Sequence, residues 1–242
     1  MKKSLIDLHT HSVLSRHAYS SLTENIDVAV NDDMLFYGIS EHQYDEKGVG
    51  AHIYAFGNCR RITPKKINNT NLLVGIELNI LDEGIKTYGI PVDRLNYAIA
   101  SIHGYVYDAK THDSEANTRN YLKAMEYPYV KILGHIDNPA HPCDYETIVK
   151  EAKKRGILIE LNNASLNEAG PRKGAREIDK IILDLCVKYD QPIILSSDAH
   201  IKYQINKFEF AEDLLKEVNF PDELVVNYNM DLIEKYIVPL IK

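Results

Sequence analysis

Short apolar runs recur along the chain, and each is followed by a stretch with the spacing of an amphipathic helix. Near-continuous apolar runs of this length are typical of parallel strands that are covered by helices. The pattern therefore predicts seven parallel strands. They are residues 5–8, 35–39, 72–76, 97–102, 129–133, 157–161 and 192–196.

The helix-like segments have recognisable beginnings and ends. One opens near Thr23, residues 144–155 stop at Gly156, and residues 176–189, 208–218 and 231–241 carry apolar positions at helical spacing. No linker rich in Pro, Gly or Ser interrupts the alternation of strands and helices. We expect one α/β domain over residues 1–242, built as a seven-stranded β/α barrel or, alternatively, as an open doubly wound sheet.

Composition narrows the class of protein. The 242 residues are 45% apolar and 26% charged, with a formal charge of −7. These values exclude extended disorder, and a net negative charge argues against binding extended nucleic acid. No apolar run is long enough to span a membrane, and Asp7 and His9 interrupt any signal-like segment. Three widely separated cysteines predict no disulfide framework, so we expect a cytoplasmic protein.

Histidine placement is the informative feature. The chain has ten histidines and no Trp, and six of the seven predicted strands end in His, Asp or Glu. Because the carboxyl ends of parallel strands meet at one face, these side chains predict a functional site there. The candidate metal ligands are His9, His11, His17, His42, Glu77, His103, His135, Asp198 and His200.

The spacing of these ligands indicates more than one ion. His9 and His11 lie two residues apart at a strand end, so both side chains leave the same face, and Asp198 and His200 repeat this spacing. Imidazole and carboxylate are ligands for zinc, manganese or iron. Nine ligands exceed the roughly four that one tetrahedral ion needs, which predicts two or three ions sharing carboxylates.

The other three histidines have simpler interpretations. His52 and His141 are predicted to be structural residues of loops. His112 is expected in a helix-cap region that could overhang the site.

The ordered motifs resemble the PHP (polymerase and histidinol phosphatase) superfamily, and within it the YcdX-like phosphatases. They are Asp-x-His-x-His at residues 7–11, His17-Ala18-Tyr19-Ser20, Gly75-Ile76-Glu77-Leu78-Asn79, Glu160-Leu161-Asn162-Asn163, Arg172-Lys173-Gly174 and Ser197-Asp198-Ala199-His200. The resemblance covers residues 4 to about 238. It implies a distorted (β/α)7 barrel with a trinuclear metal centre, and zinc is the expected metal, with manganese or iron as alternatives.

Matching motif by motif, the resemblance implies three ion sites: His9 and His11 with Glu77 and Asp198, then Glu77 with His103 and His135, then His17, His42 and His200. Two neighbours of the ligands differ from the family. Glu41 stands where Asp is common, which bears on the orientation of His42, and Gly134-His135-Ile136 replaces Ser-His-Pro.

The expected reaction is hydrolysis of small phosphomonoesters. Clustered divalent ions activate water and neutralise phosphoryl oxygens. The hypothesis is that a hydroxide bridging two ions attacks phosphorus, with Glu77, Asp198 and His135 acting through it. Guanidinium and amide groups suit phosphate contacts. The predicted substrate-binding residues are Arg172, Lys173, Asn163 and Arg16, with Ser165 a weaker candidate.

Two other functions remain open at this stage. One is a nuclease-type phosphodiesterase acting on nucleotides or DNA ends, and the other is a metal-binding module without catalysis. The basic run 59–66 is expected to be a solvated helix face. The expected partner is a small phosphorylated metabolite or nucleotide, not a membrane, and a homo-oligomer is possible.

Overall fold

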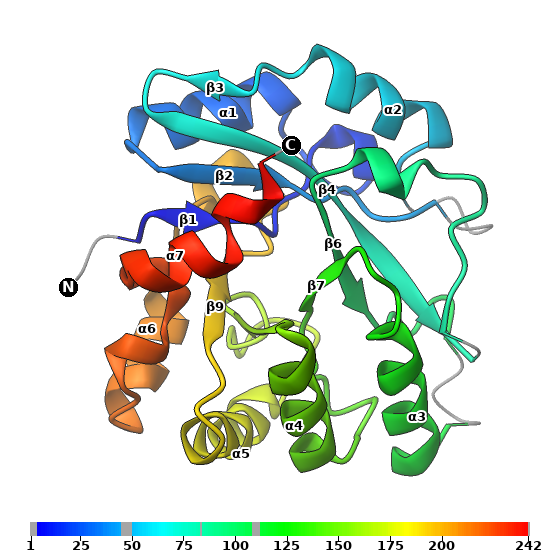
Figure 1. Ribbon diagram of the computed structural model, residues 1–242, viewed down its shortest axis with the longest axis vertical. Helices are drawn as coiled ribbons and strands as arrows, with labels where there is room; N and C mark the ends of the chain where they lie inside the picture. The colour runs from blue at the N-terminus through cyan, green and yellow to red at the C-terminus, as the bar shows by residue number, and fades with distance from the viewer. Residues whose placement is uncertain (1–3, 45–49, 83, 108–111, 242) are drawn as a thin grey trace.

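The computed structural model describes residues 4–44, 50–82, 84–107 and 112–241. Seven parallel strands follow one another around a sheet in the order in which they occur in the chain (Figure 1). They are β1 (Ile6–Asp7), β2 (Phe36–Ile39), β4 (Thr70–Leu81), β6 (Tyr97–Ser101), β7 (Val130–Leu133), β8 (Leu158–Asn162) and β9 (Ile193–Ser196). Each contains or overlaps a predicted apolar run. Two short strands, β3 (Lys66–Ile67) and β5 (Gly84–Ile85), pair antiparallel with β4 and were not predicted.

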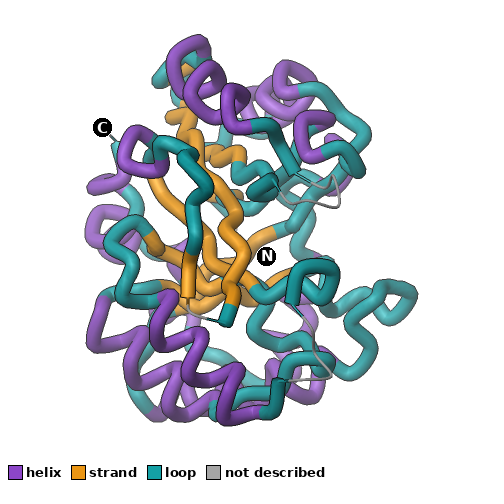
Figure 2. The backbone as a smooth tube through the Cα atoms, turned by 90° about the vertical axis from the view of Figure 1, so that its right-hand side faces the viewer, coloured by secondary structure: helices purple, strands orange, loops and turns teal. Residues whose placement is uncertain are grey.

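Helices surround the sheet, as the tube view shows (Figure 2). They are α1 (Leu22–Asn31), α2 (Ile53–Ile62), α3 (Ser114–Ala124), α4 (Tyr145–Arg155), α5 (Ala175–Lys188), α6 (Glu209–Glu217) and α7 (Met230–Tyr236). Helices α3, α4 and α5 pack side by side along one side of the sheet, and α1 and α2 lie on the other (Figure 1). No helix within the described residues is long and apolar enough to cross a membrane.

The sheet closes into a nearly complete barrel through a seam between its first and last strands. The backbone N–H of His11 donates to the carbonyl of Ala199 at 2.8 Å, in a parallel bridge beyond the ends of β1 and β9. At the other end of the seam, the Asn227 side chain bonds both the N–H of Leu195 (2.8 Å) and the carbonyl of Ile6 (2.9 Å). An amide side chain thus satisfies the strand edges that a direct ladder would otherwise pair. The distorted (β/α)7 barrel is therefore confirmed over the open-sheet alternative.

The interior of the barrel is apolar at the amino-terminal ends of the strands. Side chains that include Ile6, Phe36 and Ile194 form one buried cluster with Ile233 and Ile237, from α7 and the turn after it. Helix α7 therefore seals this end of the barrel. A sealed, apolar lower half leaves polar side chains to gather at the carboxyl ends of the strands.

Two glycines make room for one aromatic ring inside the barrel. A Cβ atom at Gly75 would lie 2.5 Å from Cζ of Tyr97, and one at Gly38 would lie 2.3 Å from the Tyr97 hydroxyl oxygen. Contacts this short do not occur between real atoms, so both positions require glycine. The ring of Tyr97 thus explains the glycine that stands two residues before Glu77.

Local sequence signals placed the ends of α4, α5 and α6 to within one residue, but α7 ends at Tyr236, five residues before the predicted end at residue 241. Helix α4 ends at Gly156 in the left-handed conformation (φ 67°), as predicted. Helix α1 begins at a capping box made by Ser21 and Glu24, two residues before the predicted Thr23. Helix α3 was not predicted, and only the last four residues of α2, residues 59–62, fall in a segment that was expected to be helical. The buried face of α3 includes Asn117, Thr118 and Asn120, so it shows no apolar stripe in the sequence.

Candidate metal centre

The Glu77 carboxylate lies at the centre of the cluster, surrounded by imidazole rings from five positions in the chain. Its Oε1 is 3.0 Å from Nε2 of His135 and 3.2 Å from Nε2 of His103. Its Oε2 is 2.7 Å from Nδ1 of His42, 3.4 Å from Nε2 of His9 and 3.7 Å from Nε2 of His11. Glu77 and each of these histidines are buried. The strand ends therefore bring together side chains that are far apart in sequence.

Backbone geometry at the strand ends aims these side chains. His42 forms a parallel bridge with Glu77, which places the two residues side by side just beyond β2. His135 (φ 30°) and Asp198 (φ 53°) have positive φ angles directly after β7 and β9. Left-handed backbone is uncommon for non-glycine residues and marks a site where the chain is held by its surroundings.

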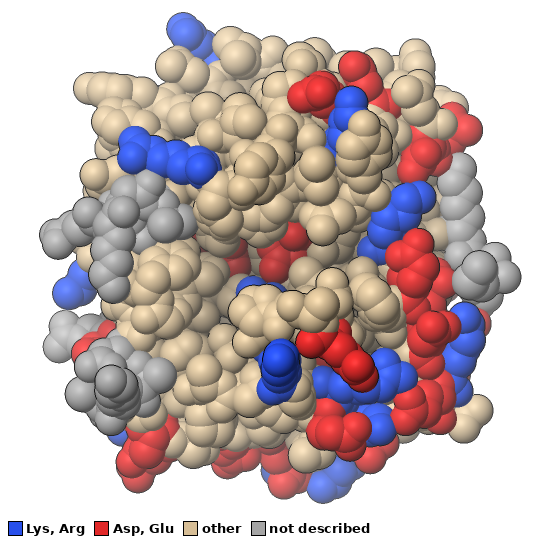
Figure 3. Space-filling model, turned by 180° about the vertical axis from the view of Figure 1, so that it is seen from behind, with Lys and Arg blue, Asp and Glu red and all other residues tan. Residues whose placement is uncertain are grey.

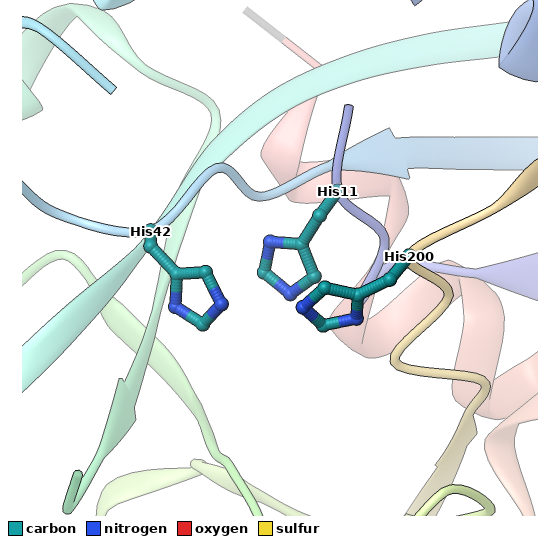
Figure 4. Close-up of side chains that lie close together, drawn as sticks. All are labelled: His11, His42 and His200. Atoms are coloured by element: carbon teal, nitrogen blue, oxygen red, sulfur yellow. The ribbon is translucent and has the colours of Figure 1, made fainter. Parts of the chain in front are cut away.

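A second group of rings lies beside the first. The side chains of His11, His42 and His200 point toward one another from the segments after β1, β2 and β9 (Figure 4). Nε2 of His200 is 2.8 Å from Nε2 of His17, and Oδ1 of Asp198 is 3.2 Å from Nε2 of His11. All nine predicted ligands therefore lie in one continuous cluster.

The donor atoms fit divalent cations. Several buried atoms make no well-formed hydrogen bond among the described residues, although one nitrogen of each imidazole lies close to the Glu77 carboxylate: Nε2 of His9, both ring nitrogens of His42, Nε2 of His103 and Oε2 of Glu77. An unpaired buried polar atom costs about 1–3 kcal/mol, so a cation that binds these atoms would remove a large penalty. Three sets of residues each offer donor atoms that lie within 4.8 Å of one another inside the set. These sets are His9–His11–Glu77, His42–Glu77–His103 and His11–His42–His200. The sets share members, so the cluster could hold several ions.

This grouping differs in one respect from the division that the family resemblance implied. His42 was expected with His17 and His200 only, whereas its Nδ1 is also 2.7 Å from Glu77. His11 likewise lies in two of the three sets. His11 and His42 therefore lie where neighbouring sets of donor atoms meet.

Electrostatics leave most of these groups in the form that binds metal. Burial opposes a charge on Glu77, but the imidazoles of His103, His42 and His9 hold its pKa well below the ordinary value. Burial lowers the pKa of His11, so this ring is neutral at neutral pH. Ionised carboxylates and neutral imidazoles are the metal-binding forms.

Glu160 and Asn79 orient two of the rings, and sequence reasoning assigned neither a role. Oε1 of Glu160 lies 2.6 Å from Nδ1 of His9, and its Oε2 accepts from the backbone N–H of His135 at 2.8 Å. Burial opposes a charge on His9, but Glu160, followed by Glu77 and Asp198, raises its pKa well above the ordinary value. Oδ1 of Asn79 lies 2.8 Å from Nδ1 of His103. The sequence feature that could have indicated a role for Glu160 and Asn79 is their position at the ends of predicted strands.

Glu41 turns toward the loop after β1. Its carboxylate accepts hydrogen bonds from the hydroxyls of Ser12 and Ser15, and Ser15 Oγ accepts from the backbone N–H of His42 at 3.0 Å. The longer side chain therefore ties the segment that carries His11 and His17 to the segment that carries His42.

Arg172 reaches the centre from the loop after β8. Its Nη1 donates to Oδ2 of Asp198 at 3.3 Å and to Oγ of Ser165 at 3.1 Å. The two carboxylate oxygens of Asp198 therefore contact different residues: Oδ1 faces His11, and Oδ2 faces Arg172. Nε and Nη2 of Arg172 donate no hydrogen bond within the described residues, although its side chain is only 16% exposed. These N–H groups are suited to an anionic ligand.

The other predicted substrate-binding residues make different contacts in this structure. Oδ1 of Asn163 accepts from the backbone N–H groups of Phe210 (3.0 Å) and Ala211 (3.1 Å), so this amide holds the start of α6. Lys173 is exposed. Arg16 is exposed next to His17, with its guanidinium 5.9 Å from the ring centre of Tyr44.

The three remaining histidines belong to none of the donor sets found among the described residues. His52 is the N-cap of α2, and the ring of His112 contacts Asp82. His141 is buried near His103 and His135, and burial, followed by these rings, lowers its pKa to about 4. The basic run 59–66 is only in part the solvated helix face that was expected. Residues 59–62 end helix α2, with Arg61 and Ile62 exposed and Cys59 buried, whereas Lys66 lies in strand β3.

The face opposite to that of Figure 1 has a recess near its middle, with acidic side chains at its floor (Figure 3). Neutral side chains form most of its rim. A recess with a negatively charged floor favours the entry and binding of cations.

Comparison with known proteins places the chain among phosphatases. It is 38% identical over 237 residues to a "probable phosphatase" of Clostridium botulinum, covering 96% of this chain and 94% of that protein. It is 39% identical over 238 residues to one of Clostridium acetobutylicum, covering 97% and 95%. No protein-family model matches the chain.

Solved structures share the fold at low sequence identity. Histidinol phosphate phosphatase from Lactococcus lactis, solved with zinc, L-histidinol and phosphate, has a TM-score of 0.63 and 16% identity, covering 90% of this chain and 95% of that one. An archaeal ribonuclease P structure with mature tRNA contains a chain with a TM-score of 0.58 and 17% identity, covering 98% and 89%.

Proposed function

Because the chain belongs to the PHP superfamily, in the family of these clostridial phosphatases, we propose that it hydrolyses small phosphomonoesters at a trinuclear metal centre. The observation that carries this proposal is the buried Glu77 carboxylate with five imidazoles around it and several donor atoms unpaired. A purely structural cluster would satisfy these atoms with protein hydrogen bonds.

The nine predicted ligands would hold the ions, and zinc is the proposed metal. They are His9, His11, His17, His42, Glu77, His103, His135, Asp198 and His200. Bound divalent ions supply an activated water molecule and neutralise the phosphoryl oxygens. Imidazole and carboxylate donors without thiolates suit zinc, manganese or iron.

The protein's own groups have separate tasks in this proposal. Arg172 binds the phosphate through Nε and Nη2, while Nη1 stays on Asp198 and Ser165. Glu77, Asp198 and His135 act by fixing the ions. Glu160 and Asn79 hold the rings of His9 and His103 in position, so that neither ring has to reorient during turnover.

The decisive experiment is elemental analysis of protein purified without chelator, followed by phosphate release from a panel of metabolite monoesters. We expect about three zinc equivalents and turnover of monoesters. Glu77→Gln should lose metal and at least 100-fold in kcat/KM, because it removes the charge at the centre of the cluster. Glu168→Gln, the same change at an exposed position in the loop after β8, is the control and should leave metal content intact.

The same panel separates the alternatives. Full activity and metal content in Glu77→Gln would refute the proposal. Faster hydrolysis of a phosphodiester or of single-stranded DNA ends than of monoesters would favour a nuclease-type enzyme instead. Metal binding with no turnover on any ester would indicate a module without catalysis.

A further inference from the structure

The guanidinium of Arg172 is held in place by a chain of buried hydrogen bonds. Nη1 donates to Oγ of Ser165 at 3.1 Å, and that hydroxyl donates to Oδ1 of Asp137 at 3.2 Å. Ser165 and Asp137 are 3% and 1% exposed. The nine predicted ligands include neither Ser165 nor Asp137, so the metal centre does not account for this chain.

The direction of each hydrogen bond is fixed by its neighbour. A hydroxyl has one proton, so when Ser165 gives it to Asp137, its lone pairs face Arg172. The buried carboxyl group of Asp179, on α5, lies close to that of Asp137. A second path closes the arrangement into a ring: the N–H of Ser165 donates to Asn162 at 3.0 Å, and Nδ2 of Asn162 donates to Oδ2 of Asp198 at 3.2 Å.

We propose that Ser165 and Asp137 are positioning residues that brace Arg172 for phosphate binding. The brace fixes Nη1, which leaves Nε and Nη2 to present two parallel N–H groups to a phosphate. An arginine that is ordered before binding loses less conformational freedom when the anion arrives. This inference rests on the proposed phosphatase function and adds to it the residues that set phosphate affinity.

The first test is Ser165→Ala in the zinc-loaded enzyme. We expect KM for a phosphomonoester and the inhibition constant of inorganic phosphate to rise about 5- to 10-fold, as for one lost hydrogen bond to a charged group. Zinc content should not change, and kcat should stay within about twofold if ground-state binding is what is lost. Ser196→Ala is the matched control, because it removes a buried hydroxyl that has no hydrogen-bond partner among the described residues.

A double-mutant cycle separates a brace from a structural role. If Ser165 acts through Arg172, then Ser165→Ala added to Arg172→Ala should weaken phosphate binding no further than Arg172→Ala alone. Asp137→Asn keeps an acceptor oxygen and should retain phosphate affinity, whereas Asp137→Ala should behave like Ser165→Ala. Additive losses in the Ser165–Arg172 cycle, with zinc retained, would overturn the proposal.

A readout that needs no activity distinguishes this inference from the proposed function. The Nε–H resonance of Arg172 in zinc-loaded, arginine-labelled protein reports whether its side chain is ordered. It should be ordered in the wild type and averaged in Ser165→Ala. The same resonance in both proteins would refute the brace and leave the phosphatase proposal standing. A wild type that hydrolyses no ester would refute the phosphatase proposal and leave this measurement valid.

Discussion

At the scale of single residues, the centre depends on which atoms are left without protein partners. Nε2 of His9 faces Glu77, whereas its Nδ1 is held by Glu160, which fixes the ring and the nitrogen that is available to an ion. Sequence motifs identified His9 but gave Glu160 no task, because a carboxylate at a strand end has the same appearance whether it binds metal or orients a ligand.

Replacing Glu160 with Gln should weaken zinc binding by about 10- to 100-fold, the usual effect of removing a carboxylate that orients a histidine ligand. Competition with a chromophoric chelator would measure it. Glu168→Gln, an exposed change in the loop after β8, serves as the control. Unchanged affinity in Glu160→Gln would show that His9 is oriented by other contacts.

His141 should make stability depend on pH. Its pKa is lowered to about 4 in the folded protein, mainly by burial. Below about pH 6.5 the unfolded chain binds a proton at His141 that the folded protein does not bind. The free energy of unfolding is therefore higher above that pH and decreases as the pH falls toward 4. The stability deficit of His141→Leu should shrink by about 2 kcal/mol between pH 7 and pH 5. Urea unfolding at the two pH values measures this, and a deficit independent of pH would contradict it.

At the scale of elements, the strands place functional residues by their register. The bridge between His42 and Glu77 sets one ligand beside another, and the glycine two residues before Glu77 lets β4 pass Tyr97. The apolar runs predicted every one of the seven parallel strands, because buried parallel strands need continuous apolar sequence. Helix α3 was missed because its buried face is largely polar.

Gly75→Ala should destabilise the fold by about 2–4 kcal/mol, because its Cβ would overlap a ring enclosed in the barrel. Gly57→Ala, in helix α2, is the matched control, since the nearest atom outside the neighbouring helix backbone, Cγ of Pro91, would lie 3.9 Å from the added Cβ. That change should stabilise the protein by about 0.5–1 kcal/mol. Urea unfolding of both variants tests the contrast, and equal midpoints would contradict it.

At the scale of the whole molecule, the seam between β1 and β9 brings the first motif of the chain to the last. His11 hydrogen bonds to the residue between Asp198 and His200, and Asn227 joins the same two strands at the other end. Closure of the barrel therefore brings the candidate metal ligands from the two ends of the chain together.

Asn227→Leu should lower stability by about 3 kcal/mol or more, because it leaves several buried backbone groups unpaired. It should also weaken zinc binding, since His9 and His11 would no longer be held beside Asp198. Asn58→Leu, at an exposed position of α2, is the control. Loss of stability with full zinc affinity would show that the seam and the centre are independent.

The sequence by itself determined the seven strands and the nine candidate ligands, because hydrophobic periodicity and motif spacing are local properties of a chain. It left a barrel and an open sheet as alternatives, and the closed seam of the tertiary structure decided between them. Only the tertiary structure decided which ligands share neighbours, that Glu41 ties two loops together, and that Asn163 supports α6 while Arg172 enters the site. These outcomes depend on distances between segments that are remote in sequence, and closure of the barrel sets those distances.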